Sequence, residues 1–155
     1  MEVLDEFDLK ILSILQKDNM TSQRVIAERV ALSSAAVHRR IERLASLGVI
    51  ARNIAVIDPE HVGRLITLIV EVAVENERVE ALAELKRVFS SAPEVQQCYY
   101  VTGEQDFILV VTTRDMKEYE ALTQRLFFGH QNVKRFRTHV VMDRVKVTLD
   151  VPLGA

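Results

Sequence analysis

The stretch Ser22–Leu47, SQRVIAERVALSSAAVHRRIERLASL, constrains the fold most, because it predicts two helices joined by a tight turn. On the second helix Val37, Ile41 and Leu44 recur at spacings of four and three residues, which places them on one face. The opposite face is small and charged, and it comprises Ala35, Arg39, Glu42 and Arg43, with His38 and Arg40 on its flanks. Such a helix fits a DNA major groove, where arginine contacts guanine and phosphate. An amphipathic helix with a solvated charged face has the same pattern, so the helix alone leaves both interpretations open.

The charge distribution along the chain favours the DNA interpretation. The 155 residues carry a formal net charge of −2, which by itself argues against a polyanionic partner. From Arg24 to Arg52, however, six arginines face two glutamates, a local balance of +4. From Asp58 onward 12 basic residues face 15 acidic ones, a balance of −3. A basic segment on an acidic protein can orient the protein on a polyanion.

Local signals also mark where the N-terminal helices begin and end. Asp5 is a suitable N-cap of a first helix, and it places Asp8 in the first turn, where negative charge suits the helix dipole. Ser33 is a suitable N-cap of a third helix, and Gly48 is suited to the position just after that helix ends. Three short helices are therefore expected.

The β-prone run VIARNIAVID, residues 49–58, follows the third helix and is expected to form a wing. We therefore expect a winged helix-turn-helix DNA-binding domain over residues 1–57. The stretch 58–63 contains Asp-Pro and a glycine and is expected to be a linker.

Residues 64–155 predict a second domain with the order β-α-β-β-α-β, which is the ferredoxin-like arrangement. The expected strands are 65–74, 95–101, 107–113 and 133–148, and the expected helices are 76–90 and a segment after Asp115. Asp115 with Glu118 three residues later fits a capping box. The predicted fold class is thus α+β, with a winged helix-turn-helix followed by a ferredoxin-like domain.

Two of these strands predict an assembly. Residues 107–111, FILVV, are apolar on both strand faces, as is much of LITLIVEVAV at 65–74. Two helices cover only one face of such a sheet, so a second copy of the chain is expected to cover the other face. We expect a homodimer through the C-terminal sheets.

The turn Thr102–Asp106, TGEQD, is a candidate small-molecule site. A glycine turn can expose backbone N–H groups to a carboxylate, while Glu104 or Asp106 can bind an ammonium group. A plain β-turn also favours aspartate, and from the residues alone that is the more probable interpretation.

Five segments of the chain resemble the Lrp/AsnC ("feast/famine") family of transcription factors. They are LDEFDLKIL at 4–12, IAERVALS at 26–33, VHRRIERLASLGVI at 37–50, VTGEQDFILVV at 101–111 and TLDVPL at 148–153. The resemblance implies a winged helix-turn-helix joined to an amino-acid-sensing ferredoxin-like domain. It also implies dimers that often assemble into octamers, and it makes the TGEQD turn the favoured effector site, completed by neighbours from another subunit.

Two sets of candidate site residues follow. The DNA-binding set is Ser33, Ser34, Ala35, His38, Arg39, Arg40 and Arg43, and the effector-binding set is Tyr100, Thr102, Gly103, Glu104, Asp106, Thr138 and His139. Arg40 has an alternative role, an ion pair with an acid of its own domain. His38 by itself proves little, since neutral surface histidines are common.

The function we expect is sequence-specific regulation of transcription by binding double-stranded DNA in response to an amino acid. An architectural DNA-binding protein without an effector is an alternative, and a dimeric α+β-barrel enzyme with His139 inside is a weaker one. The four histidines have no metal-binding spacing and Cys98 is expected to be a buried thiol, so no metal, cofactor or catalytic residue is predicted. With no run of about 18 apolar residues and no leader, we expect a cytoplasmic protein without a membrane partner.

Overall fold

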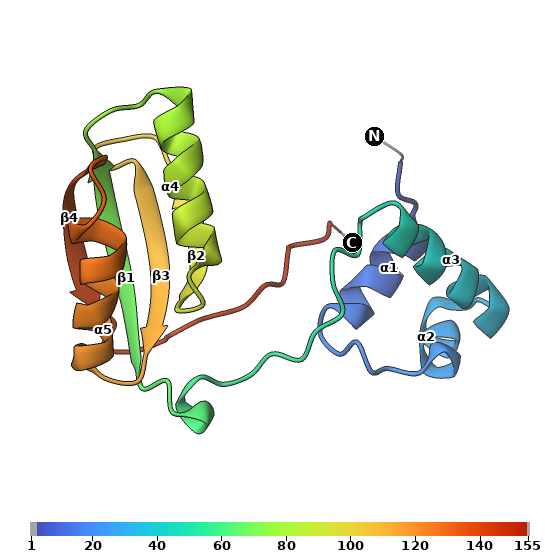
Figure 1. Cartoon of the computed structure of the whole chain (residues 1–155). Coiled ribbons are helices and arrows are strands. Elements are labelled where there is room, and N and C mark those ends of the chain that lie inside the picture. The colour runs from blue at the N-terminus through green and yellow to red at the C-terminus, as the bar shows by residue number, and fades with distance from the viewer. Residues whose placement is uncertain (1–2, 155) are drawn as a thin grey trace. The chain divides into compact units, whose positions relative to one another are not determined.

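The computed structural model describes residues 3–154, which form two compact units (Figure 1). The helical unit comprises residues 3–55 together with the C-terminal tail 146–154, and the sheet unit comprises residues 56–145. We expected the tail to belong to the second domain. Instead, Gln16 and the backbone of Val151 exchange two hydrogen bonds of 3.1 Å, which attach the tail to the helical unit. No helix among the described residues is long and apolar enough to cross a bilayer.

The helical unit contains three helices, α1 (Glu6–Leu15), α2 (Gln23–Val30) and α3 (Ser34–Ser46). The helices begin after Asp5, Ser22 and Ser33, each of which accepts a backbone N–H of the first turn, and Asp5 and Ser33 are the N-caps that the sequence predicts. At the first helix Asp8 also accepts the Asp5 N–H, which completes a capping box. Gly48 follows α3 with φ of 72°, a conformation that glycine adopts without strain.

The expected wing is not formed as a strand. Residues 49–58 are all described, and none of them is in a strand. The β-prone side chains lack a partner strand in the single chain, and Ile54 and Val56 remain exposed. The stretch expected to be a linker contains a short turn of 3₁₀ helix, η1 (Glu60–Val62), and the Asp58 carboxylate accepts the Glu60 N–H at 3.0 Å just before it.

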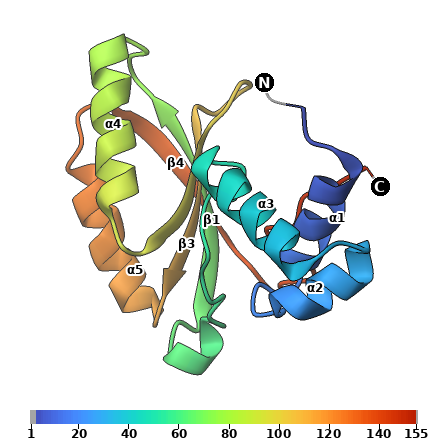
Figure 2. The same cartoon turned by 90° about the vertical axis from the view of Figure 1, so that its right-hand side faces the viewer.

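The sheet unit has four antiparallel strands in the order β2-β3-β1-β4, as the β-α-β-β-α-β pattern requires. The strands are β1 (Ile66–Val74), β2 (Val95–Tyr100), β3 (Phe107–Thr113) and β4 (Val133–Val140), and the helices are α4 (Val79–Ser91) and α5 (Met116–Thr123) with a π-helical turn η2 (Gln124–Phe128). Figure 2 shows both helices on the same face of the sheet. The core lies between these helices and the sheet, around Phe89, Phe107 and Phe127.

Three expected details of this unit are wrong. The helix α4 begins at Val79 and not at 76, because the Asn76 side chain accepts the Arg78 N–H in a turn. The fourth strand ends at Val140 and not at 148, because Val140 pairs with Leu68 and β1 begins only two residues earlier, at Ile66, so most of 141–148 would have no partner. Asp115 caps α5, but Glu118 does not return the bond as a capping box would.

The Glu118 carboxylate is bound elsewhere. It accepts the Arg114 N–H at 2.6 Å and the Arg64 guanidinium at 2.8 Å. Mainly because of the Arg114 N–H, the pKa of Glu118 falls from 4.5 to about 2.

Candidate nucleic-acid interface and effector site

Helix α3 is held by its apolar face, as its spacing predicts. Val37 and Leu44 are fully buried in the helical unit, while Ala35, Arg39 and Glu42 are exposed on the other side. Ser33 caps the helix by accepting the Ala36 N–H at 3.2 Å. The first turn, with the exposed Ser34, therefore presents backbone N–H groups and the positive end of the helix dipole to solvent, which suits a phosphate group.

His38 connects α3 to the beginning of α2. Its Nδ1 atom lies 3.0 Å from the Gln23 amide nitrogen, and its Nε2 atom lies 3.3 Å from a Glu42 carboxylate oxygen. The imidazole is thus oriented by both neighbours while half of its surface stays exposed. Gln23 was not among the residues predicted from the sequence, and its position at the start of α2 beside His38 adds an amide to this exposed surface.

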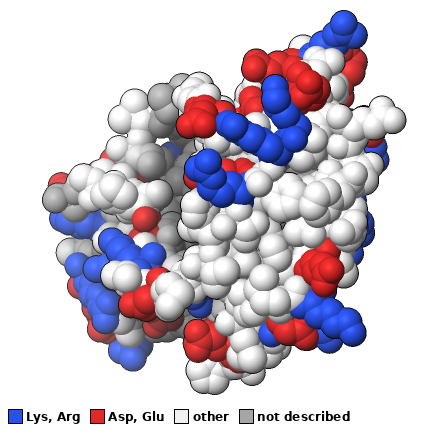
Figure 3. All heavy atoms as spheres, turned by 90° about the vertical axis from the view of Figure 1, so that its left-hand side faces the viewer, with Lys and Arg blue, Asp and Glu red and all other residues white. Residues whose placement is uncertain are grey.

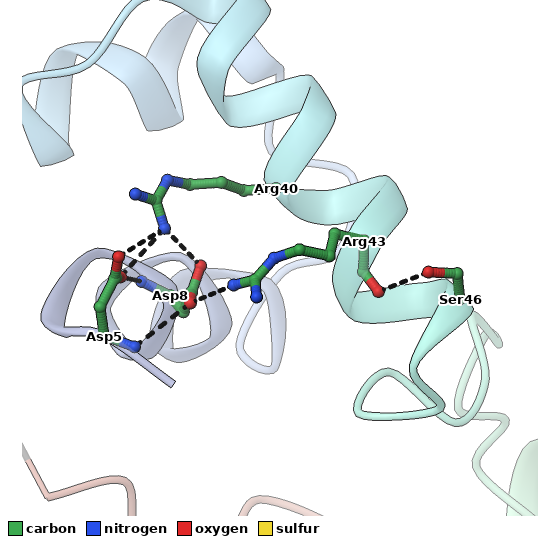
Figure 4. Close-up of polar contacts among 5 residues, drawn as sticks. All are labelled: Asp5, Asp8, Arg40, Arg43 and Ser46. Atoms are coloured by element: carbon green, nitrogen blue, oxygen red, sulfur yellow. Dashed lines mark hydrogen bonds and ion pairs between the residues drawn. The ribbon is translucent and has the colours of Figure 1, made fainter. Parts of the chain in front are cut away.

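Arg40 and Arg43 point toward the N-terminus of α1, as Figure 4 shows. Arg40 donates to one oxygen of Asp8 at 2.7 Å and to Asp5 at 2.8 and 3.0 Å, and Arg43 donates to the other oxygen of Asp8. Only 1% of the Asp8 side chain is exposed. The two aspartates and two arginines therefore join α1 to α3 across more than 30 residues of sequence.

This cluster changes the charge that α3 presents. The pKa of Arg40 is raised, mainly by its hydrogen bond to Asp8, and the Asp8 N–H lowers the pKa of Asp5. The alternative in which Arg40 pairs with an acid of its own domain is the one the structure contains. Arg43, expected to face DNA, is bound to Asp8 as well. Asp5 and Asp8 reduce the +4 balance of segment 24–52 to +2, a compensation invisible in that segment alone.

Arg39 differs from these two arginines. It is exposed on α3, and no carboxylate in residues 3–154 lies within ion-pairing distance of it. It borders a cleft of ≈ 460 Å³ between the first turn of α1 and α3, which Asp5, Asp8, Arg40 and Arg43 also line. Arg39 is therefore a cation of α3 available to an external anion.

The TGEQD turn joins β2 to β3. Gly103 has φ of 127°, so the turn requires a residue without a side chain there. Asp106 is half-buried, and one oxygen of its carboxylate accepts the Val74 N–H at 2.7 Å. Its own backbone bonds to Val72 and Val101, so Asp106 extends the sheet at this end.

Glu104, by contrast, reaches β4, which lies beyond β1 in the sheet. Its carboxylate lies 3.0 Å from the Arg135 guanidinium, and both side chains are more than half exposed. Gln105, Arg135, Phe136 and Arg137 enclose a hollow of ≈ 180 Å³ beside this pair. Arg135 and Arg137 were not among the residues predicted from the sequence, although the alternation of VKRFRTHV places two arginines and His139 on one strand face.

The remaining predicted effector residues do not converge in one chain. Thr138 faces the helices, where its hydroxyl bonds to the buried Tyr119, and burial raises the pKa of Tyr119. Tyr100 also lies on the helix side, against Phe107 and under the Lys86 ammonium. His139 lies on the other face, 3.4 Å from Glu71. Of the predicted effector residues, Glu104 is the one whose side chain forms an ion pair with Arg135 among residues 3–154.

On the side of the molecule drawn in Figure 3, charged groups of both signs border a broad uncharged area. Such a surface attracts a polyanion weakly, in contrast to the exposed side of α3. Among residues 3–154, no three histidine, cysteine or acidic side chains are grouped so that they could hold a metal ion.

The chain is similar to regulators of transcription along its whole length. Residues 4–51 match the family described as winged helix-turn-helix DNA-binding, and residues 67–151 match the Lrp/AsnC ligand binding domain. An uncharacterized HTH-type transcriptional regulator, y4tD, of Sinorhizobium fredii is 45% identical over 150 residues, 97% of this chain and 89% of that protein.

Two solved structures are similar in fold. The crystal structure of an AsnC family transcriptional regulator from Agrobacterium tumefaciens has a TM-score of 0.91 at 31% identity and covers 97% of both chains. A transcriptional regulator from Neisseria meningitidis, in complex with L-methionine, has a TM-score of 0.91 at 28% identity with the same coverage. The chain described here belongs to the Lrp/AsnC family of transcriptional regulators, with its helix-turn-helix and ligand-binding domains in that order.

Proposed function

We propose that this regulator reads DNA by inserting α3 into the major groove, as a homodimer, and that a free amino acid changes its DNA affinity. The observation that carries the proposal is the exposed side of α3. It combines the small residues Ser34 and Ala35, which allow close approach, with His38 and with Arg39, which forms no ion pair among residues 3–154.

The residues on the exposed side of α3 are suited to different parts of DNA. The capped N-terminus with Ser33 and Ser34 suits a backbone phosphate, whereas Arg39, one turn further along, suits the O6 and N7 atoms of guanine. His38, oriented by Gln23 and Glu42, provides a second polar contact at a base edge. Phosphate contacts position the helix, and base contacts give sequence specificity.

The dimer is supported by the face of the sheet opposite the helices. Ile69 is 38% exposed and Tyr99 52% exposed there, and the half-buried Ile108 and Val110 lie between them in the strand register. A second copy would cover this apolar surface. Two copies of α3 would then meet successive major grooves, about 34–36 Å apart. Assembly to an octamer rests on the family resemblance.

For the effector site we propose the TGEQD turn with Arg135. A free amino acid carries a carboxylate and an ammonium group, and Arg135 and Glu104 supply one counter-charge for each at 3.0 Å from one another. The hollow beside Gln105 and Arg137 leaves room for a side chain, and further residues would come from another subunit. The Neisseria relative in complex with L-methionine supports an amino acid as the ligand.

The test begins with DNA. A duplex is selected by the wild-type protein from a random-sequence pool, and affinities are measured for that duplex and for unselected DNA. Arg39→Ala is expected to weaken binding to the selected duplex by about 1–3 kcal/mol and to relax one base preference. Arg87→Ala removes an exposed arginine of α4 and is the matched control for charge. If the selected duplex binds no better than unselected DNA, the protein is an architectural DNA-binding protein.

The effector is tested on the same protein by calorimetric titration with each of the twenty amino acids. At least one amino acid is expected to bind and to change the affinity of the protein for the selected duplex. The size of this change is set by how differently the amino acid binds two assemblies of the protein. Glu104→Gln is expected to abolish this response and leave ligand-free DNA binding unchanged. The paired control is Glu75→Gln, because Glu75 forms a looser exposed pair with Lys134 at 3.7 Å. An unchanged response in Glu104→Gln would contradict the proposed site.

A further inference from the structure

Asp8 is the carboxylate that α1 presents to α3, and both of its oxygens are occupied. Arg40 donates to one oxygen at 2.7 Å, while Arg43 and the Asp5 N–H donate to the other. The Asp8 side chain is 1% exposed, while those of Arg40 and Arg43 are 26% and 36% exposed. One buried acid thus holds two arginines whose surfaces still reach solvent (Figure 4).

We propose that Asp8 determines the specificity of DNA binding, because it keeps two of the three arginines of α3 out of contact with phosphates. The inference rests on the proposed function, in which α3 enters the groove. Without Asp8, Arg43 would lose this acceptor and Arg40 would keep its bonds to the more exposed Asp5. Their long side chains could then turn toward the phosphate backbone more readily, on a helix whose first turns approach DNA.

The burial of Asp8 is what makes this restraint strong. To reach a phosphate, Arg43 would have to leave a carboxylate oxygen that water cannot hydrate, and losing a charged partner costs a buried carboxylate more than an exposed one. The phosphate of a duplex remains hydrated and screened by counterions, so it is the weaker competitor. Arg39 has no such competitor within residues 3–154 and stays available.

Phosphate contacts and base contacts contribute differently to recognition. Phosphate contacts raise the affinity for every DNA sequence alike, whereas base contacts raise the affinity for the target sequence alone. Two further phosphate contacts would therefore strengthen binding to the many competing sites of a genome. Neutralising Arg40 and Arg43 lets a smaller set of contacts, centred on Arg39, decide where the protein binds.

The test compares salt dependence of binding to a random-sequence duplex in the full-length protein. Asp8→Asn keeps the size of the side chain and removes its charge. Each freed arginine is expected to add about 0.9 to the slope of log affinity against log salt, so affinity falls about 3.5-fold more between 50 and 200 mM NaCl for one arginine and about 12-fold more for two. The ratio of affinities for selected and random DNA is expected to fall.

Two further variants measure the contribution of Arg43 to the salt dependence. Arg43→Gln in the wild-type background is expected to leave the slope for random DNA unchanged, because Asp8 already holds Arg43 away from phosphates. In the Asp8→Asn background the same change is expected to remove the gain. If Arg43→Gln alone flattens the slope by about one, Arg43 contacts phosphate despite Asp8, and the proposal is overturned even where Asp8→Asn does not fold.

A folded Asp8→Asn protein with the wild-type slope would also overturn the proposal, since Asp8 would then only join two helices. These results are distinct from a failure of the proposed function. If Arg39→Ala binds the selected duplex as tightly as wild type, α3 does not read DNA through Arg39, whatever the salt slopes of the Asp8 variants.

Discussion

Each unit of the molecule holds one carboxylate between two arginines, but the two carboxylates differ in burial. In the helical unit Asp8 is 1% exposed and joins Arg40 and Arg43 of another helix. In the sheet unit the Glu118 side chain is 17% exposed and binds Arg64 and its own neighbour Arg114. The first arrangement fixes the position of a helix, whereas the second only joins Arg64, just after the linker, to the start of α5.

The difference reflects the apolar surface each unit can bury. Phe89, Phe107 and Phe127 pack edge to face in the sheet unit, with ring centroids 5.4 and 6.0 Å apart. The one phenylalanine of the helical unit, Phe7, is 37% exposed and lies under the Arg40 guanidinium. A small three-helix unit buries little apolar surface, so the buried ion pairs orient α3 where packing alone would leave it less defined.

The largest expected effect is on the sheet unit. Phe107→Ala removes a fully buried ring and is expected to lower the free energy of unfolding of this unit by about 3–5 kcal/mol, through lost burial and the cavity left behind. Thermal unfolding with hydrogen exchange read separately for each unit measures the loss. Val79→Ala, at a position 78% exposed, is the control. Equal loss of protection in both units would show that they unfold as one.

A smaller effect is expected from the buried carboxylate. Asp8→Ala leaves Arg40 and Arg43 without their shared acceptor, and we expect it to destabilise the helical unit by about 1–3 kcal/mol, because the arginines can partly turn to water. The measurement is urea denaturation, monitored through hydrogen exchange of the backbone amides of α1 and α3. Glu6→Ala removes an exposed i,i+4 pair with Lys10 on the same helix and should cost under about 0.5 kcal/mol. Equal losses in the two variants would contradict the role given to burial.

The smallest effect is expected from Glu118, and it depends on pH. Its pKa is about 2 in the folded protein against 4.5 ordinarily, so the unfolded chain binds this proton more readily. The stabilisation is therefore complete above about pH 4.5 and is lost as the pH falls toward 2. The melting temperature of Glu118→Gln should decline less steeply over this range than that of wild type. Parallel declines would show that the folded and unfolded pKa values of Glu118 are similar.

Local signals in the sequence were sufficient for the starts of the first and third helices of the first domain. Asp5, Ser22 and Ser33 cap the helices that follow them because an N-cap requires only a side-chain oxygen and three residues of chain. The strand Phe107–Thr113 has the expected bounds for a similar reason, since its apolar run ends at polar turns. Where a strand ends because its partner strand ends nearby, as at Val140, the sequence did not predict the end, because pairing depends on a distant strand.

The sequence by itself determined the α+β class, the order of the two domains, the faces of α3 and the family. These properties depend on spacing and on motifs within short stretches. Only the tertiary structure decided which charges of α3 are available, because Asp8 lies 32 and 35 residues before the arginines that it neutralises. It likewise decided that Asp106 supports the sheet while Glu104 meets Arg135, a residue 31 positions away. Charge pairs act through distance in space, which residue spacing within one segment does not contain.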